Sequence, residues 1–252
     1  MLLNPAQMVA IVAELALMIA LPAALMVWWC RRRQVPATVP LIAAACYLVN
    51  LAVNVPLTTM LLPALGLTPL LLTALIALTY GLCEETARWL SFRVGALRRN
   101  RTGDGGVAAG LGHGGSESIM IGLPYLFGTV LALIAPASLP AATTSALAGA
   151  SPWAFVATGL DRLPAMAGQL VFALLIVLAY KRGRRFFWLA VAAHAGLDFV
   201  MFTLRDNAPL PVFVGAWALT GVLAAVIAFR LWRGLRAAPA RRADQAPAQS
   251  LA

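Results

Sequence analysis

Two adjacent glutamates and an arginine lie near the end of a long apolar run, in the segment GLCEETARWL. Charged side chains this deep in a bilayer cost a few kcal/mol each even on lenient insertion scales, so they persist mainly where they serve a function. Glu84 precedes Arg88 by four residues, the favourable orientation for an ion pair along a helix. That pair would leave Glu85, ~100° further round the helix, as the less neutralised acid. The structural alternative is a buried ion pair that only joins helices.

Each of the two histidines in the chain stands one helical turn before an acid. His113 precedes Glu117 by four residues, and His194 precedes Asp198 by four. Side chains on a helix lean toward its N-terminus, so each carboxylate can reach back to its histidine. A carboxylate on one ring nitrogen fixes the tautomer and leaves the other nitrogen free to act on water, a metal ion or a substrate. Both pairs are therefore candidates for catalytic chemistry.

The chain around these residues has the composition of a polytopic membrane protein. Of its 252 residues, 62% are hydrophobic and 11% are charged, and the mean hydropathy is +0.85. Apolar runs long enough to cross ~30 Å of hydrocarbon as helices predict an all-α bundle of about seven spans within one domain, residues 1–233. The predicted spans are residues 8–29, 39–62, 69–92, 107–135, 153–180, 186–204 and 210–232. The tail over residues 234–252 has too few apolar residues to pack and is predicted to be disordered in the cytoplasm.

The positions of the cations predict the orientation of the bundle. The net charge of +10 comes mainly from Lys and Arg at the ends of apolar runs, where they mark topology and do not indicate a nucleic-acid partner. With sides alternating, every inside segment carries several cations, and the outside loops carry only Arg205. Since short cytoplasmic loops are enriched in Lys and Arg, we expect the N-terminus outside and the C-terminus inside, in the bacterial inner or plasma membrane.

Counting residues from the cytoplasmic ends brings the candidate residues to one depth. Glu84 and Glu85 lie about eight residues from the Arg93 end of the third predicted span, which is ~12 Å along a helix. His113 and His194 lie at a similar depth on the fourth and sixth spans, which both enter from the cytoplasm. We therefore expect three separate spans to meet at a polar cavity that is open toward the cytoplasm.

Small and polar residues near this level have mainly structural interpretations. Glycines around His113 recur at four-residue intervals, with two more between them: Gly106, Gly110, Gly114, Gly112 and Gly115. They favour either close packing of helices or a glycine wall that admits a substrate backbone beside the histidine. Asn50 and Asn54, one turn apart in the second span, are expected to hydrogen-bond between helices.

Taken in order, these residues resemble the motifs of a known family. The motifs are Glu84-Glu85-x-x-Arg88, Gly112-His113-Gly114-Gly115-x-Glu117, Asp161-Arg162-x-x-Ala165 and His194-x-x-x-Asp198. They resemble the successive motifs of the YhfC family of intramembrane peptidases, which is similar to the CAAX-processing and bacteriocin-processing membrane proteases. The resemblance covers residues from about 81 to 200. Relative to the CAAX group, the glutamate-to-arginine spacing is one shorter and Asp198 replaces an asparagine, while Asp161 stands where the YhfC pattern has a glutamate.

The resemblance implies hydrolysis of a peptide bond in a membrane-embedded or membrane-associated substrate. Carried over onto this chain, Glu84 or Glu85 is the general base that activates water together with His113. His194, with Asp198, orients the reactants or stabilises the developing oxyanion. Supporting residues are Arg88, Glu117, Asp161 and Arg162.

Two versions of this chemistry are compatible with the sequence. A glutamate-based protease uses the acids and histidines directly and needs no cofactor. A metalloprotease would bind zinc through His113, His194 and a carboxylate, keeping one position for water. Gln169 occupies a position where a third histidine could stand, and there is no His-Glu-x-x-His helix. The sequence therefore favours the metal-free version.

Two functions of other classes use similar residues. A proton-coupled transporter also buries Glu, His and Asp at mid-depth, although no second inverted half is visible in the sequence. A non-catalytic relative could bind membrane peptides without cutting them, and the departures at Asp161 and Asp198 favour this alternative. Cleavage of a peptide by the purified protein separates the peptidase from both.

Overall fold

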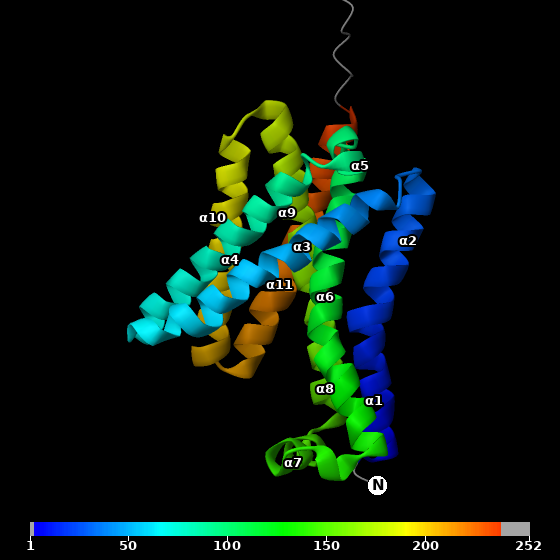
Figure 1. Ribbon diagram of the computed structural model, residues 1–252, viewed down its shortest axis with the longest axis vertical. Helices are drawn as coiled ribbons and strands as arrows, with labels where there is room; N and C mark the ends of the chain where they lie inside the picture. The colour runs from blue at the N-terminus through cyan, green and yellow to red at the C-terminus, as the bar shows by residue number, and fades with distance from the viewer. Residues whose placement is uncertain (1–2, 238–252) are drawn as a thin grey trace, which may run out of the picture.

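In a computed structural model that describes residues 3–237, the chain folds as an all-α bundle with seven helices long and apolar enough to cross a membrane. This confirms the predicted fold class. The spans are Pro5–Arg33, Thr38–Leu65, Pro69–Ser91, Gly103–Ile134, Pro152–Arg182, Arg185–Asn207 and Leu210–Arg236. The start of the first span and the end of the last lie at opposite ends of the molecule, as an odd number of crossings requires (Figure 1).

Three of these spans are interrupted, and the others are single helices. The interrupted ones are α1 (Pro5–Leu15), η1 (Ala16–Ala20) and α2 (Leu21–Arg33); α3 (Thr38–Pro56), η2 (Leu57–Leu61) and η3 (Pro63–Leu65); and α8 (Pro152–Leu160) with α9 (Arg162–Arg182). The continuous ones are α4 (Pro69–Ser91), α6 (Gly103–Ile134), α10 (Arg185–Asn207) and α11 (Leu210–Ala237). Short helices α5 (Gly95–Arg99), η4 (Pro136–Ser138) and α7 (Ala141–Gly149) lie in the connections.

Proline accounts for the π-helical turn in the first span. Pro22 has no backbone N–H, so it cannot complete the α-helical hydrogen bond to the carbonyl four residues earlier. That carbonyl belongs to Met18, within the π-helical segment η1. It accepts a hydrogen bond of 2.9 Å from the Ser118 hydroxyl of α6 instead. The irregular turn therefore ties α6 to the first span through a buried polar contact.

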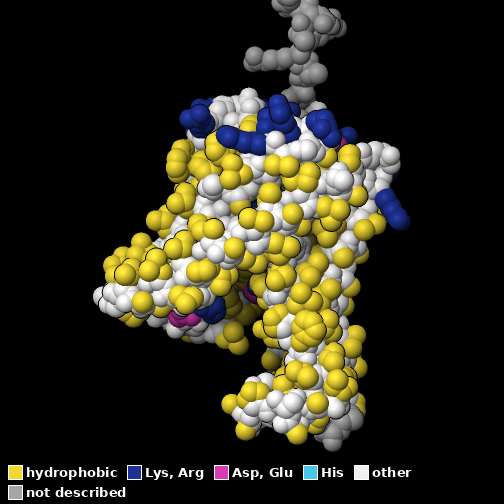
Figure 2. All heavy atoms as spheres, in the orientation of Figure 1, with side chains coloured by type: hydrophobic (Ala, Val, Ile, Leu, Met, Phe, Trp, Pro, Cys, Tyr) yellow, Lys and Arg dark blue, Asp and Glu magenta, His cyan; other side chains and the backbone are white. Residues whose placement is uncertain are grey.

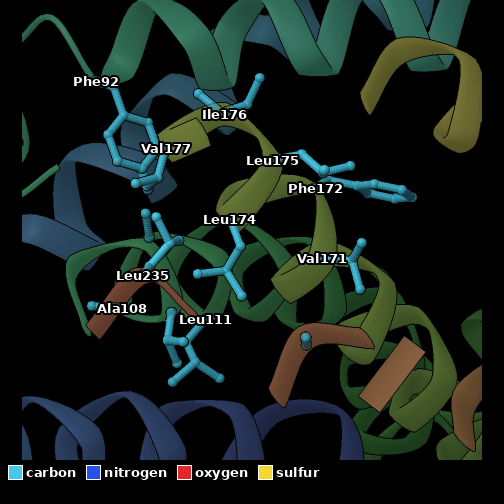
Figure 3. Close-up of a cluster of buried hydrophobic side chains, with 14 of the residues drawn as sticks. Phe92, Ala108, Leu111, Val171, Phe172, Leu174, Leu175, Ile176, Val177 and Leu235 are labelled. Atoms are coloured by element: carbon cyan, nitrogen blue, oxygen red, sulfur yellow. The ribbon is translucent and has the colours of Figure 1, made fainter. Parts of the chain in front are cut away.

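Helix α9 is the centre of the bundle. Its most apolar window is 67% buried, whereas the other spans reach between 11% and 33%. The segment from Leu170 to Ala179 is apolar on every side, which is the pattern of a helix enclosed by neighbours. Figure 3 shows Leu174, Val177 and other α9 side chains packed with Phe92 and Leu235 from helices distant in sequence. This tightly packed centre positions Gln169, the residue directly before the apolar segment, against the other helices.

The glycines around His113 serve helix packing. A Cβ atom on Gly112 would lie 2.2 Å from the Pro40 carbonyl oxygen of α3, and one on Gly114 would lie 2.7 Å from the Cβ of Gln169 in α9. Helix α6 therefore touches a neighbouring backbone on one side and the base of the Gln169 side chain on the other. Within residues 3–237, no glycine lines the cavity described below, so the alternative of a glycine wall for the substrate is wrong.

Alanine at position 112 should destabilise the bundle. Its methyl group would collide with the Pro40 backbone of α3, and overpacking of this kind costs typically 1–3 kcal/mol. Gly128→Ala on the same helix is the matched control, because nothing lies within 4 Å of the added Cβ and alanine favours the helix by roughly 0.5–1 kcal/mol. Thermal unfolding in detergent should rank Gly128→Ala at or above the wild type and Gly112→Ala below it. Equal unfolding temperatures for the two variants would show that the α3–α6 contact is not tight.

One boundary shifts, and one prediction about polar residues is wrong. Helix α11 continues to Ala237, four residues past the predicted end of the domain, with Leu235 packed into the core and Arg236 3.7 Å from Asp104. Residues 238–252 of the predicted disordered tail lie outside the described residues. The side-chain amides of Asn50 and Asn54 are buried, and both nitrogens lack a hydrogen-bond partner among residues 3–237, so the predicted inter-helix bonds are not present.

Lys and Arg side chains gather at one end of the bundle on the face shown in Figure 2. We call this the cation-rich end; it contains the C-terminal end of α9, the N-terminal end of α10 and the C-terminal end of α11. The end is the one expected to face the cytoplasm. The orientation across the membrane remains a prediction from the sequence.

Candidate active site

Close contact between α4 and α10 brings the paired glutamates to His194. A Cβ atom on Gly81 would lie 2.8 Å from the Val191 carbonyl oxygen and 2.9 Å from the Ala195 nitrogen. Only a glycine permits this approach of two helix backbones. One turn further along α4, Glu84 and Glu85 consequently face α10 beside His194.

Arg88 pairs with Glu85, and the predicted pair with Glu84 is wrong. The Arg88 Nε donates a 3.0 Å hydrogen bond to Glu85 Oε2, and both side chains are fully buried. The remaining guanidinium nitrogens donate to the backbone oxygen and the side-chain oxygen of Gln169 in α9. These two contacts hold the guanidinium toward α9, on the side where Glu85 lies. Glu84 is therefore the acid without a cation partner.

His113 contacts Glu84, and the predicted pair with Glu117 is also wrong. His113 Nε2 lies 3.1 Å from Glu84 Oε2, while the Tyr47 ring stands edge-on to the imidazole with 4.8 Å between ring centroids. Glu117 instead accepts a 2.7 Å hydrogen bond from Gln169 Nε2. The imidazole is completely buried. Its neighbours are Tyr47 of α3 and Glu84 of α4, so it contacts other helices and not the acid on its own helix.

His194 is held from both sides of its ring. Its Nδ1 lies 2.9 Å from Glu85 Oε1, and the Phe172 ring stacks on the imidazole at 4.5 Å and 11°. Its Nε2 lies 3.6 Å from Asp198 Oδ2, so the predicted proximity of this pair is confirmed, and 3.9 Å from Glu84 Oε2. A carboxylate that accepts the Nδ1 proton leaves Nε2 as the free nitrogen. That nitrogen faces two carboxylates.

The supporting residues form a chain of contacts behind this centre. Gln169 connects Arg88 to Glu117, and Arg162 lies 3.7 Å from Glu117 and pairs with Asp161 where α8 gives way to α9. No positive role was predicted for Gln169, although an amide in an otherwise apolar helix needs a hydrogen-bond partner when buried. Tyr47 and Phe172 were missed entirely, because an aromatic residue in an apolar span carries no signal that distinguishes it from core.

A cavity of about 360 Å³ opens in front of these residues. Six of the seven spans contribute to it; its walls are Tyr47, Leu51, Val55, Tyr80, Glu84, Glu117, Ile121, Asp161, Arg162, Ala165, Gln169, Phe172, His194, Leu197, Asp198, Met201, Phe202, Arg205, Phe213 and Trp217. Figure 2 shows a hollow below the middle of the molecule with acidic atoms inside it. The cavity thus connects the polar centre to the surface of the protein.

The cavity extends away from the cation-rich end, which corrects the predicted opening. From His194 it follows α10 to Arg205 near the C-terminal end of that helix, and it reaches Phe213 near the beginning of α11. Toward the cation-rich end, α4 continues from the glutamates to the buried side chains of Arg88 and Phe92, which do not line the cavity. The opening therefore lies at the end predicted to be outside.

The donor atoms at the centre have the chemistry of a metal site. Among residues 3–237, no group of three or more His, Cys, Asp or Glu side chains has a metal-binding arrangement. However, His113 Nε2 and His194 Nε2 face the same Glu84 oxygen at 3.1 and 3.9 Å, and ligands of a tetrahedral zinc ion lie roughly 3.3 Å apart. Glu85 supports His194 from behind, as carboxylates do for zinc-bound histidines. The donor types therefore suit a zinc-type ion, although among residues 3–237 they are not arranged around a common point.

Comparison with known proteins supplies one match. A protein-family model described as YhfC intramembrane metalloprotease matches residues 17–210, a range that includes every residue of the centre. No curated protein and no solved structure matches the chain.

Proposed function

Because the chain belongs to the YhfC intramembrane metalloprotease family, we propose that it is an endopeptidase that hydrolyses a peptide bond of a membrane-associated substrate, in the bacterial inner membrane. The observation that carries the proposal is the arrangement of one buried acid without a cation, Glu84, facing the two histidines of the chain at the inner end of a cavity. Hydrolysis of an amide needs a base for water and donors for the oxyanion. This centre provides both.

In this reaction Glu84 takes a proton from water, and the water oxygen attacks the scissile carbonyl carbon. Its proximity to His113 Nε2 and its lack of an arginine partner support this role. Glu85, which helix geometry alone left as the less neutralised acid, is the one that pairs with Arg88. The carbon–nitrogen bond then breaks, and the proton passes from Glu84 to the leaving amine. His194 faces the same space, and with both ring nitrogens protonated between Glu85 and Asp198 it would donate from Nε2 to the water or the oxyanion. Glu85 holds His194 in place.

The donor types of the same residues suit a divalent metal. His113 Nε2, His194 Nε2 and the Glu84 carboxylate would hold it. When bound, the ion would polarise the attacking water and the scissile carbonyl as a Lewis acid. In that case Asp198, which lines the cavity 3.6 Å from His194 Nε2, is the carboxylate that remains for proton transfer.

Cleavage of a quenched fluorescent peptide library by the purified protein in detergent tests the proposal. We expect cleavage by the wild type and none by Glu84→Gln. Loss of cleavage with a chelator, recovery with added zinc, and about one zinc per chain by elemental analysis would assign the metal-dependent version, whereas cleavage indifferent to the chelator would assign the glutamate version. A folded wild-type protein that cuts no peptide would overturn the peptidase proposal.

A further inference from the structure

We propose that the aromatic wall of the cavity is the subsite for an apolar side chain of the peptide substrate, and that the substrate enters from the end opposite the cation-rich end. The aromatic wall consists of Tyr80, Phe202, Phe213 and Trp217. The inference rests on the proposed peptidase function and adds to it the chemistry of the substrate and its direction of approach.

The aromatic wall is built by three helices and presents apolar surface. Tyr80 of α4 and Phe202 of α10 meet edge to face, with 6.2 Å between ring centroids and 70° between planes. The Trp217 indole nitrogen donates a 3.2 Å hydrogen bond to the Asp161 backbone oxygen. Its one polar atom is thereby satisfied inside the protein, and the ring serves as wall.

The aromatic wall is within reach of residues next to the scissile bond. On α4, Tyr80 precedes Glu84 by one turn, or ~6 Å, and on α10 Phe202 follows His194 by about two turns, or ~12 Å. An extended peptide advances about 3.3–3.6 Å per residue. A substrate bound at the catalytic centre would therefore place a side chain against the wall about two to four residues from the cut.

The mouth of the cavity determines the direction of entry. Two lining residues are largely exposed: Val55 is 45% exposed, and the Arg205 side chain is 60% exposed. Both lie in the parts of α3 and α10 that are remote from the cation-rich end. Arg88 and Phe92 are buried on the opposite side of the glutamates, so the exposed part of the cavity lining lies at the end opposite the cation-rich end.

The chemistry of the aromatic wall favours an apolar occupant. The two arginines of the cavity, Arg162 and Arg205, are each paired with an acid and do not select the sign of a charge. A charged side chain of either sign would lose its water against the aromatic rings, a costly transfer for a charge. Leucine or phenylalanine avoids this cost.

The test compares peptides that differ only at one position two to four residues from the cut. We expect leucine or phenylalanine to be cleaved tenfold or more faster than aspartate or lysine. Trp217→Ala should shift the preference toward larger side chains by about tenfold, because it enlarges the subsite. Trp188→Ala is the matched control: this tryptophan is 60% exposed and lies outside the cavity, so rate and preference should stay unchanged. Should Trp217→Ala misfold, Phe213→Leu makes the same comparison.

Retained cleavage with an unchanged preference in both Trp217→Ala and Phe213→Leu would overturn the inference and leave the proposed function standing. If the wild type cuts no peptide, a peptide-binding experiment tests the subsite independently of cleavage. In Phe213→Cys, a leucine-containing peptide should protect the thiol from a membrane-impermeant reagent, and its aspartate counterpart should not. In proteoliposomes, the peptide should protect the thiol only when peptide and reagent are added on the side of the membrane that holds the end opposite the cation-rich end. Protection by peptide added on the other side would refute the proposed direction of entry.

Discussion

Replacing Glu84 with glutamine should abolish peptide cleavage while the protein stays folded. Glutamine has the size and shape of glutamate but cannot take a proton from water, and a positioned general base contributes about 10²- to 10⁴-fold to a rate. The ion pair of Arg88 is with Glu85, so the change leaves this buried pair intact. Initial cleavage rates, with thermal unfolding of the same samples, measure both effects.

Two other glutamates provide the comparison. Glu14→Gln is the matched control, because Glu14 is also buried but lies outside the cavity; its cleavage rate should equal that of the wild type. Glu85→Gln should lower both the rate and the unfolding temperature, since Glu85 anchors Arg88 and His194 together. A Glu84→Gln protein with wild-type turnover would remove Glu84 from the mechanism.

Arg88→Ala should be among the most destabilising single changes in the chain. It leaves the Glu85 carboxylate buried without a cation, and breaking a buried ion pair from one side costs about 3–5 kcal/mol. It also removes the donors to Gln169 that join α4 to α9. The unfolding free energy in detergent checks the size of the effect.

The comparison for Arg88 uses an exposed arginine of the same region. Arg93 lies just beyond α4, with its guanidinium 4.0 Å from the centroid of the Trp89 ring, and an exposed contact of this kind is worth about 0.5–1 kcal/mol. Arg93→Ala should therefore change stability little. The double variant Arg88→Met, Glu85→Leu should recover part of the lost stability, because no unpaired charge remains, yet stay inactive. An Arg88→Ala protein as stable as the wild type would contradict the assignment of a buried ion pair between Arg88 and Glu85.

Hydropathy and helix length determined the membrane-spanning fold from the sequence. A run of apolar residues must cover the hydrocarbon thickness whatever its neighbours are, so the spans were predictable one at a time. The breaks within them were less visible: the π-helical turn before Pro22 and the interruption at Asp161 lie inside runs that read as continuous. Counting along the helices also placed Glu84, His113 and His194 at one depth, because rise per residue is constant.

Only the tertiary structure decided which partners these residues take. Arg88 can reach an acid three or four residues earlier with similar ease, and the contact with Gln169, distant in the chain, turns it to Glu85. His113 likewise selects Glu84 on another helix over Glu117 on its own. The cavity opens away from the cation-rich end because Arg88 and Phe92 pack against α9 on the other side. Sequence periodicity sets the depth of a side chain, whereas the rotation of a helix and its neighbours are set by packing between helices.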